Sequence, residues 1–181
     1  MSCILLTGGF GYIGSHTAAL LAEINKDFVI YDNFCNSKKS VIKRLEMIIN
    51  KEVNYEIGDI RDIKKLVKLI NKYKVESVIH FAALKSVENS ILNPIKYYEN
   101  NVGGSISLLC AMEMTGVKKL LFSSTAAIYG EPEYSPIDEN HPLRTLNPYG
   151  NTKLIIENIL KDIFNNYKDW SILSLRYFNP I

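Results

Sequence analysis

Short apolar runs alternate with segments of helical periodicity along this 181-residue sequence, and this alternation limits the folds that it can adopt. The apolar runs are continuous, as expected for strands that are covered on both faces. We expect six strands, over residues 3–7, 28–31, 53–57, 77–81, 119–123 and 171–177. Helical patterns cover residues 12–24, 40–49, 62–73, 94–115 and 149–164. This order predicts one domain over residues 1–181, an α/β Rossmann-like fold with a doubly wound, parallel, six-stranded sheet and helices on both faces.

Local signals predict where several of these helices begin and end. Ser40 and Asp62 are suitable N-caps for the helices that follow them, and Gly116 is a suitable stop for the long helix before it. The proline-marked connection from residue 129 to residue 149 is long for a segment without secondary structure. We therefore expect this connection to have a functional role.

Composition excludes several classes of function. The formal net charge is +2, and the basic residues are scattered, so no stripe of basic residues predicts nucleic-acid binding. No apolar run is long enough to cross a bilayer, which predicts no membrane partner. The three cysteines are far apart and form no metal-ligand spacing, so we expect free thiols in a reducing compartment and no metal. The absence of a charged leader or cleavage site makes the cytosol the expected location.

A glycine series follows the first expected strand and opens the first expected helix. Gly8, Gly11 and Gly14 form a GxxGxxG pattern, where a backbone without Cβ atoms lets a pyrophosphate approach the helix N-terminus. Asp32 closes the second strand, where a carboxylate accepts hydrogen bonds from a ribose and repels a 2′-phosphate. The sequence therefore predicts a dinucleotide site that prefers NAD to NADP. Asp59, after the third strand, is equally suited to cap a helix or to bind the adenine amine.

A tyrosine and a lysine four residues apart open the last expected helix. Tyr149 and Lys153 lie one turn apart on the same face, and a nearby ammonium favours a tyrosine phenolate that acts as a base. This spacing also arises by chance, but here it follows the fifth strand at the edge where ligands bind in such folds. Ser123 and Thr125 end that strand, and either hydroxyl is suited to bind a reacting sugar oxygen. We therefore predict Tyr149 and Lys153 as catalytic residues, together with the hydroxyl of either Ser123 or Thr125.

With these residues in place, the chain resembles the UDP-glucose 4-epimerase family of the extended short-chain dehydrogenases/reductases along essentially its whole length. The resemblance is carried by motifs at residues 7–17 (TGGFGYIGSHT), 32–37 (DNFCNS), 58–60 (GDI), 80–85 (HFAALK), 97–102 (YYENNV), 148–150 (PYG) and 175–180 (LRYFNP). The aspartate motif and the Phe-Ala-x-Leu-Lys run are much more specific than the glycine series. Thr125 stands where this family often has serine, and Ala83 stands where it often has glycine.

The resemblance implies residue roles, an NAD cofactor and a UDP-sugar substrate. Cofactor contacts are implied for Tyr12, Ile13, Asp32, Asn33, Phe34, Cys35, Asn36, Ser37, Asp59, Ile60, Phe81, Ala82, Ala83, Lys85, Asn100, Tyr149, Lys153 and Phe178. Substrate contacts are expected for Lys85, Ser123, Thr125, Tyr149, Tyr177 and Asn179. The resemblance also implies Thr125 as the catalytic hydroxyl beside the sugar O4, with Tyr149 as the base and Lys153 as its activator. The implied activity interconverts UDP-glucose and UDP-galactose by transient oxidation at sugar C4. The family also implies a homodimer of the full-length enzyme, through the helices at residues 94–115 and 149–164.

Several alternatives compete with this reading. The resemblance implies a further strand and a smaller substrate lobe, which this sequence does not contain, so one alternative is an NAD-binding module without turnover. Another is a different NAD-dependent nucleotide-sugar epimerase. A related 4,6-dehydratase carries an Asp–Glu pair where this chain has Ala126 and Ala127, which disfavours elimination of water.

Overall fold

All six strands of the sheet pair in parallel, in the order β3-β2-β1-β4-β5-β6. The strands are β1 (Cys3–Thr7), β2 (Asp27–Asp32), β3 (Tyr55–Ile57), β4 (Val75–His80), β5 (Lys119–Thr125) and β6 (Ser171–Tyr177). The computed structural model describes residues 3–179. The predicted fold class, a Rossmann-like parallel sheet, is confirmed.

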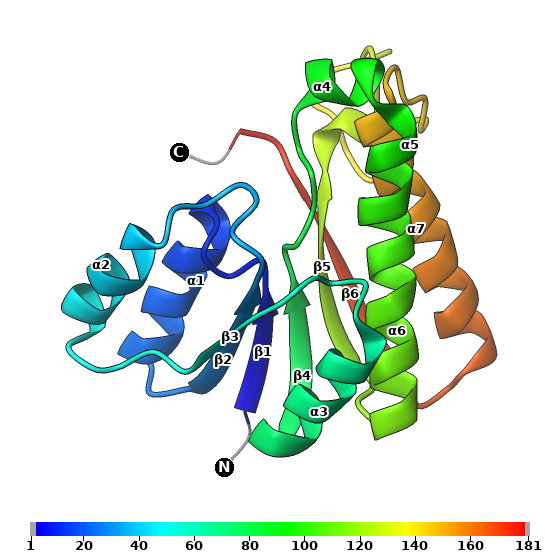
Figure 1. The fold of residues 1–181 in the computed structure, drawn as a ribbon. Coiled ribbons are helices and arrows are strands. Elements are labelled where there is room, and N and C mark those ends of the chain that lie inside the picture. Colours follow the sequence, from blue (N-terminus) through cyan, green and yellow to red (C-terminus); the bar gives the residue numbers. More distant parts are fainter. Residues whose placement is uncertain (1–2, 180–181) are drawn as a thin grey trace.

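Helices cover both faces of this sheet (Figure 1). On one face lie α1 (Tyr12–Glu23) and α2 (Ser40–Ile49), and on the other lie α3 (Ile63–Tyr73), α6 (Gly104–Thr115) and α7 (Pro148–Asn166). Each face has its own apolar core. The larger core, on the side of α3, α6 and α7, contains fully buried Leu5, Leu108 and Phe122, and the smaller one contains Leu6 and Ile30. Leu5 and Leu6 are adjacent in β1 and enter different cores, because successive side chains of a strand point to opposite faces.

The expected long helix of residues 94–115 is continuous but not uniform. It begins as α5 (Pro94–Tyr97), widens into a π-helical turn η1 (Tyr98–Gly103) and continues as α6. Gly116, in the left-handed conformation at φ 75°, ends it as predicted. A short helix before it, α4 (Val87–Leu92), was not expected from the sequence.

Of the two predicted caps, one is confirmed and one is wrong. The Asp62 carboxylate accepts a hydrogen bond from the Lys65 backbone N–H at 3.0 Å and caps α3. Ser40 does not cap α2. The chain is already helical at Lys39, the N-cap position, so Ser40 is the first residue of the helix and its hydroxyl makes no cap hydrogen bond.

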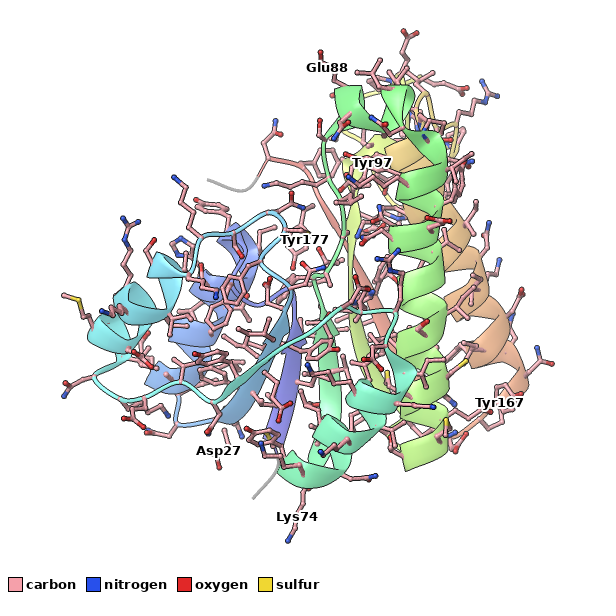
Figure 2. The ribbon with its side chains drawn as sticks, viewed as in Figure 1. Asp27, Lys74, Glu88, Tyr97, Tyr167 and Tyr177 are labelled. Atoms are coloured by element: carbon pink, nitrogen blue, oxygen red, sulfur yellow. The ribbon has the colours of Figure 1, made fainter. Side chains whose placement is uncertain are left out.

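The strand order reverses beside β1, which pairs with β2 on one side and with β4 on the other. In a sheet of this kind, the chain leaves β1 and β4 toward opposite faces and opens a crevice at their carboxyl ends. Figure 2 shows Tyr177, at the carboxyl end of β6, far from Asp27, at the start of β2. Within residues 3–179, none of the helices combines the length and the apolar composition that crossing a membrane requires.

Candidate active site

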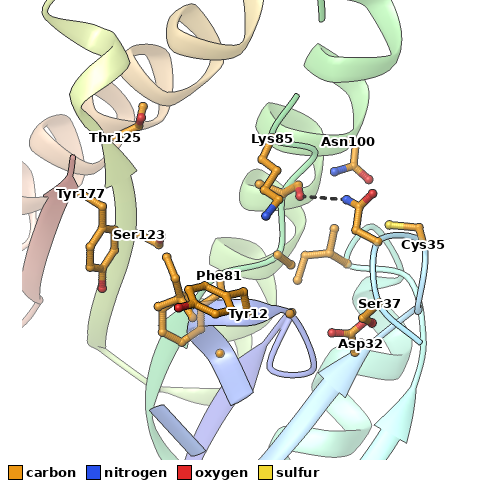
Figure 3. A pocket seen from close by; sticks show the side chains of 18 of the residues that line it. Tyr12, Asp32, Cys35, Ser37, Phe81, Lys85, Asn100, Ser123, Thr125 and Tyr177 are labelled. Carbon is orange, nitrogen blue, oxygen red and sulfur yellow. Dashed lines mark hydrogen bonds between the residues drawn. The ribbon is translucent and has the colours of Figure 1, made fainter. Parts of the chain in front are cut away.

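A cavity of about 420 Å³ occupies this crevice. Its walls come from the carboxyl ends of all six strands or the segments that follow them. They are formed by Gly8, Gly11, Tyr12, Ile13, Gly14, Tyr31, Asp32, Asn33, Cys35, Asn36, Ser37, Gly58, Ile60, Phe81, Ala82, Ala83, Lys85, Asn100, Ser123, Ser124, Thr125, Tyr149, Lys153, Tyr177, Phe178 and Asn179. Figure 3 shows Asp32, Cys35 and Ser37 at one end and Ser123, Thr125 and Tyr177 at the other, with Tyr12 and Phe81 between them.

The glycine series builds the floor of this cavity. Gly8 has φ +68°, and a Cβ there would lie 2.6 Å from the backbone nitrogen of Ala82. A Cβ on Gly14 would lie 2.7 Å from the Gly8 carbonyl oxygen. The helix α1 starts at this point, with Gly11 as its N-cap, no capping side chain and no acidic residue in its first turn. The first N–H groups of α1 therefore have no side-chain acceptor, which fits a diphosphate bound at the helix N-terminus.

Asp32 is buried at the end of β2 and is held in place by backbone N–H groups. Its Oδ2 accepts from Phe10 N at 3.0 Å, and its Oδ1 accepts from Phe34 N at 2.8 Å. Both bonds fix the position of the carboxylate, which lines the cavity. This arrangement suits recognition of a ribose diol.

Two residues predicted for the cofactor site do not line the cavity. The Phe34 ring stacks on Phe10, with ring centroids 5.1 Å apart, and packs against the smaller core. The Asp59 carboxylate forms two hydrogen bonds of 2.8 Å with the Arg61 guanidinium, and this partner lowers the Asp59 pKa to about 2. Asp62 caps α3 in its place, so Asp59 is not the cap of that helix.

At the other end of the cavity, Lys153 is buried beneath Tyr149. Its Nζ donates to the Ser123 carbonyl oxygen at 2.6 Å and lies 4.7 Å from the centroid of the Phe122 ring. Burial lowers the Lys153 pKa to about 7, against the opposing charge of Glu157. Burial also raises the Tyr149 pKa above its ordinary value, and hydrogen bonding by the Thr125 side chain works in the opposite direction.

The strand β5 delivers its hydroxyl groups to this end. Thr125 is the N-cap of a 3-10 turn, η2 (Ala126–Ile128), and its Oγ1 accepts from Ala127 N at 3.2 Å. Asn147 caps α7 through a bond from Gly150 N at 2.8 Å and so fixes the start of the helix that carries Tyr149. The connection between η2 and α7 supplies none of the cavity-lining residues, so its expected functional role stays a prediction.

A chain of buried hydrogen bonds runs from Thr7, at the end of β1, toward α7, the helix that carries Tyr149 and Lys153. His80 Nδ1 contacts Thr7 Oγ1 at 2.6 Å, and His80 Nε2 contacts Ser105 Oγ at 2.9 Å. Ser105 donates to the Asn101 carbonyl oxygen at 2.6 Å, which makes His80 Nε2 the donor to Ser105 and Nδ1 the acceptor from Thr7. Burial lowers the His80 pKa to about 3, so the ring is neutral at physiological pH.

Asn101 extends this chain to the helix α7 from inside the π-helical turn. Its side chain exchanges hydrogen bonds with the Leu84 backbone, at 2.8 and 3.0 Å, and donates to Thr152 Oγ1 at 3.1 Å. Thr152 in turn donates to the Tyr149 carbonyl oxygen at 2.7 Å. No periodic pattern in the sequence indicates this network, because its members come from β1, β4, η1, α6, α7 and the loop that contains Leu84.

Three further residues in the cavity wall were not expected from the sequence. They are Tyr31, Gly58 and Ser124. Tyr31 donates from its hydroxyl to the Asp59 carbonyl oxygen at 2.9 Å, and its ring lies where a Cβ on Gly58 would be. The other cavity-lining residues were among those predicted. The sequence therefore predicted the residues of the cavity wall better than the buried hydrogen-bonded residues behind them.

A parallel sheet with a glycine-lined crevice and a Tyr–Lys pair at its carboxyl edge is the arrangement of the extended short-chain dehydrogenases/reductases. Comparison with known proteins narrows this class. Residues 5–180 match the family model described as GDP-mannose 4,6 dehydratase, and the chain belongs to this family.

Its relatives include many UDP-glucose 4-epimerases. The chain is 49% identical over 179 residues to the UDP-glucose 4-epimerase of Yersinia enterocolitica. This alignment covers 98% of the chain and 53% of that relative. It is 46% identical over 177 residues to that of Bacillus subtilis, covering 98% of the chain and 52% of the relative. The chain thus spans about half the length of the curated relatives that it matches.

Solved structures give the same result. The UDP-glucose 4-epimerase of Stenotrophomonas maltophila, with bound NAD and formylated UDP-arabinopyranose, superposes with a TM-score of 0.97 at 41% identity over 100% of this chain and 54% of that one. The enzyme of Bifidobacterium longum, in complex with NAD+ and UDP, superposes with the same TM-score and identity over 99% of this chain and 54% of that one.

Proposed function

We propose that this chain binds NAD in the cavity and forms the catalytic part of a UDP-glucose 4-epimerase, which interconverts UDP-glucose and UDP-galactose through transient oxidation at sugar C4. The observation that carries the proposal is that one cavity contains the glycine-lined helix start and Asp32 at one end and the Tyr149–Lys153 pair at the other. Relatives of this sequence are UDP-glucose 4-epimerases, and two related structures contain NAD.

In this proposal the cofactor lies along the cavity floor. The N-terminus of α1 would hold the diphosphate, and the preorganised Asp32 carboxylate would bind the adenosine ribose and disfavour a 2′-phosphate. Asn36, whose side-chain nitrogen lies 3.5 Å from the Ala83 carbonyl oxygen, lines the same cavity and would contact the ligand. NAD supplies a reversible hydride acceptor at the other end.

The protein residues would manage the proton. Tyr149 would remove the proton from the sugar 4-hydroxyl as base and return it after the hydride returns to the other face of C4. Lys153, bonded to the Ser123 carbonyl oxygen, would stabilise the phenolate by its charge. Thr125, whose side chain interacts with Tyr149, would position the reacting oxygen, with Ser123 beside it.

The carboxylates of the site argue against a dehydratase reaction. Elimination of water needs an acid and a base near the sugar. Among the described residues that line the cavity, Asp32 is the one carboxylate, and it lies at the adenosine end. Positions 126 and 127 are alanines in the 3-10 turn beside Thr125. A different NAD-dependent nucleotide-sugar epimerase has the same chemical requirements and is distinguished by its substrate.

The test is reduction of the bound cofactor. The purified chain is loaded with NAD and mixed with UDP-glucose, and reduced nicotinamide is followed by its absorbance and fluorescence. Reduction in the original chain and its loss in Tyr149→Phe are the expected results. Reduction that persists in Tyr149→Phe contradicts the assignment of the base. Bound NAD that no UDP-sugar reduces identifies the chain as a cofactor-binding module without turnover.

A further inference from the structure

The helix α7 carries a third functional group on the face of the proposed catalytic pair. Tyr149, Lys153 and Glu157 follow one another at intervals of four residues and therefore lie one above the other on the helix. Glu157 does not line the cavity. Its side chain is 11% exposed, which is unusual for a carboxylate without a structural or functional partner.

The Glu157 carboxylate is bound from both neighbouring strands. Ser124 in β5 donates its hydroxyl to Oε1. Arg176 in β6 donates from Nε to Oε1 at 3.2 Å and from Nη2 to Oε2 at 2.8 Å. This bidentate interaction fixes the orientation of the carboxylate as well as its position. One side chain of α7 is thereby tied to two strands of the sheet.

The partners of Glu157 are adjacent in sequence to residues of the cavity wall. Ser124 lies between Ser123, whose carbonyl oxygen accepts from Lys153, and Thr125. Arg176 precedes Tyr177 in β6. Any rotation of α7 that moved Glu157 away from these partners would also move Lys153 and Tyr149, which lie one and two turns before it on the same helix.

Arg176 also contacts Tyr129, in addition to Glu157. Its Nη1 donates to the Tyr129 hydroxyl oxygen at 2.9 Å, and its guanidinium lies 5.1 Å from the centroid of the Tyr129 ring. The Tyr129 ring in turn stacks on Phe178, at a centroid separation of 6.2 Å. The guanidinium is therefore held on both sides, and its hydrogen bonds to Glu157 raise its pKa above the ordinary value.

We propose that the Glu157–Arg176 pair is a positioning device for Tyr149 and Lys153: it locks the rotation of α7 against β5 and β6 and sets the charge that Lys153 experiences. Neither residue lines the cavity, so both act through α7, the helix that carries Tyr149 and Lys153. The inference rests on the proposed function for the meaning of the Tyr–Lys pair, but the contacts themselves do not depend on it.

The sign of the electrostatic effect follows from the groups around Lys153. Within the described residues, the titratable groups coupled to its ammonium are Glu157 on α7 and His80 on β4, which is neutral near pH 7. The Glu157 anion favours the protonated lysine, against burial. Removal of the anion should lower the Lys153 pKa, whereas removal of the Arg176 cation leaves an unneutralised anion and should raise it.

The experiment measures the Lys153 pKa directly, in the chain without NAD or sugar. The chain is labelled with ¹³C-lysine, the Lys153 Cε signal is assigned from its absence in Lys153→Met, and its chemical shift is followed with pH. Glu157→Gln keeps the shape of the side chain and should lower the Lys153 pKa below about 7, because it removes the anion that favours the protonated lysine. Arg176→Gln should shift the Lys153 pKa in the opposite direction.

Asp162→Asn is the matched control, because Asp162 is an exposed carboxylate on the same helix. It should leave the Lys153 pKa unchanged. A folded Glu157→Gln chain with an unchanged Lys153 pKa, or shifts of the same sign in both variants, would overturn the proposal. If Glu157→Gln does not fold, the sign of the shift in Arg176→Gln decides alone. A failure of the chain to bind NAD would overturn the proposed function but would leave this measurement unaffected.

Discussion

The buried ammonium of Lys153 makes a quantitative prediction about stability and pH. Lys153 is 3% exposed, and burial lowers its pKa from 10.5 to about 7. The unfolded chain restores the ordinary pKa, so between these two values unfolding takes up a proton. The free energy of unfolding should therefore rise with pH across this window, by up to about 1.4 kcal/mol per pH unit from this residue.

The perturbation is Lys153→Met, which removes the ammonium and keeps most of the side-chain volume. Loss of the bond to the Ser123 carbonyl oxygen costs a similar amount at every pH and does not change the slope. From about pH 7 to about pH 9, the original chain should gain about 2 kcal/mol relative to the variant. Most of this gain should come in the upper part of the interval, because Lys153 is still partly protonated in the folded chain near its pKa.

The assay is urea unfolding of both chains at a series of pH values, followed by circular dichroism. Comparison of the two chains cancels the contribution of every group that titrates identically in both. As pH rises, the free energy of unfolding of the original chain should increase relative to that of Lys153→Met. Parallel pH dependences would show that Lys153 is not perturbed by burial and would refute the reasoning.

Three further predictions concern the cavity and its support. Gly8→Ala forces a Cβ to within 2.6 Å of the Ala82 nitrogen at positive φ, so NAD affinity measured by calorimetry should fall about tenfold or more, equivalent to roughly 1–3 kcal/mol; an unchanged affinity contradicts the tight floor. Asp32→Asn should weaken NAD binding and narrow the preference for NAD over NADP, and a competition titration that finds the preference unchanged would reject the ribose assignment. His80 has a pKa lowered to about 3 by burial, so stability should fall as pH drops from about 6.5 toward 3, and His80→Gln should flatten that part of the unfolding profile.

The sequence predicted the features that depend on local patterns. Continuous apolar runs predicted the six strands, and the spacing of Gly8, Gly11 and Gly14 located the start of α1. The Asp62 cap was predictable because a capping carboxylate acts on an N–H three residues away. Ser40 carried a similar local signal, but its position relative to the helix start depends on how the preceding turn, at Lys39, is folded.

Features that depend on several elements at once could not be predicted in the same way. The π-helical turn around Asn101 is stabilised by partners from the β4–α4 loop and from α7, so a helical periodicity alone does not reveal it. The Glu157–Arg176 pair joins residues from α7 and β6 that share no motif. Phe34 was predicted within the aspartate motif, but its ring stacks on Phe10 against the smaller core, while its backbone N–H donates to Asp32.

The most direct test of the proposed site is an equilibrium titration of the chain with NAD by isothermal calorimetry, with the folded state checked by circular dichroism. We expect saturable binding at one site per chain, weaker binding of NADP, and loss of binding in Gly14→Val, whose side chain would collide with the Gly8 carbonyl oxygen. A folded chain that takes up no NAD would contradict the assignment of the glycine-lined floor and Asp32 to a dinucleotide.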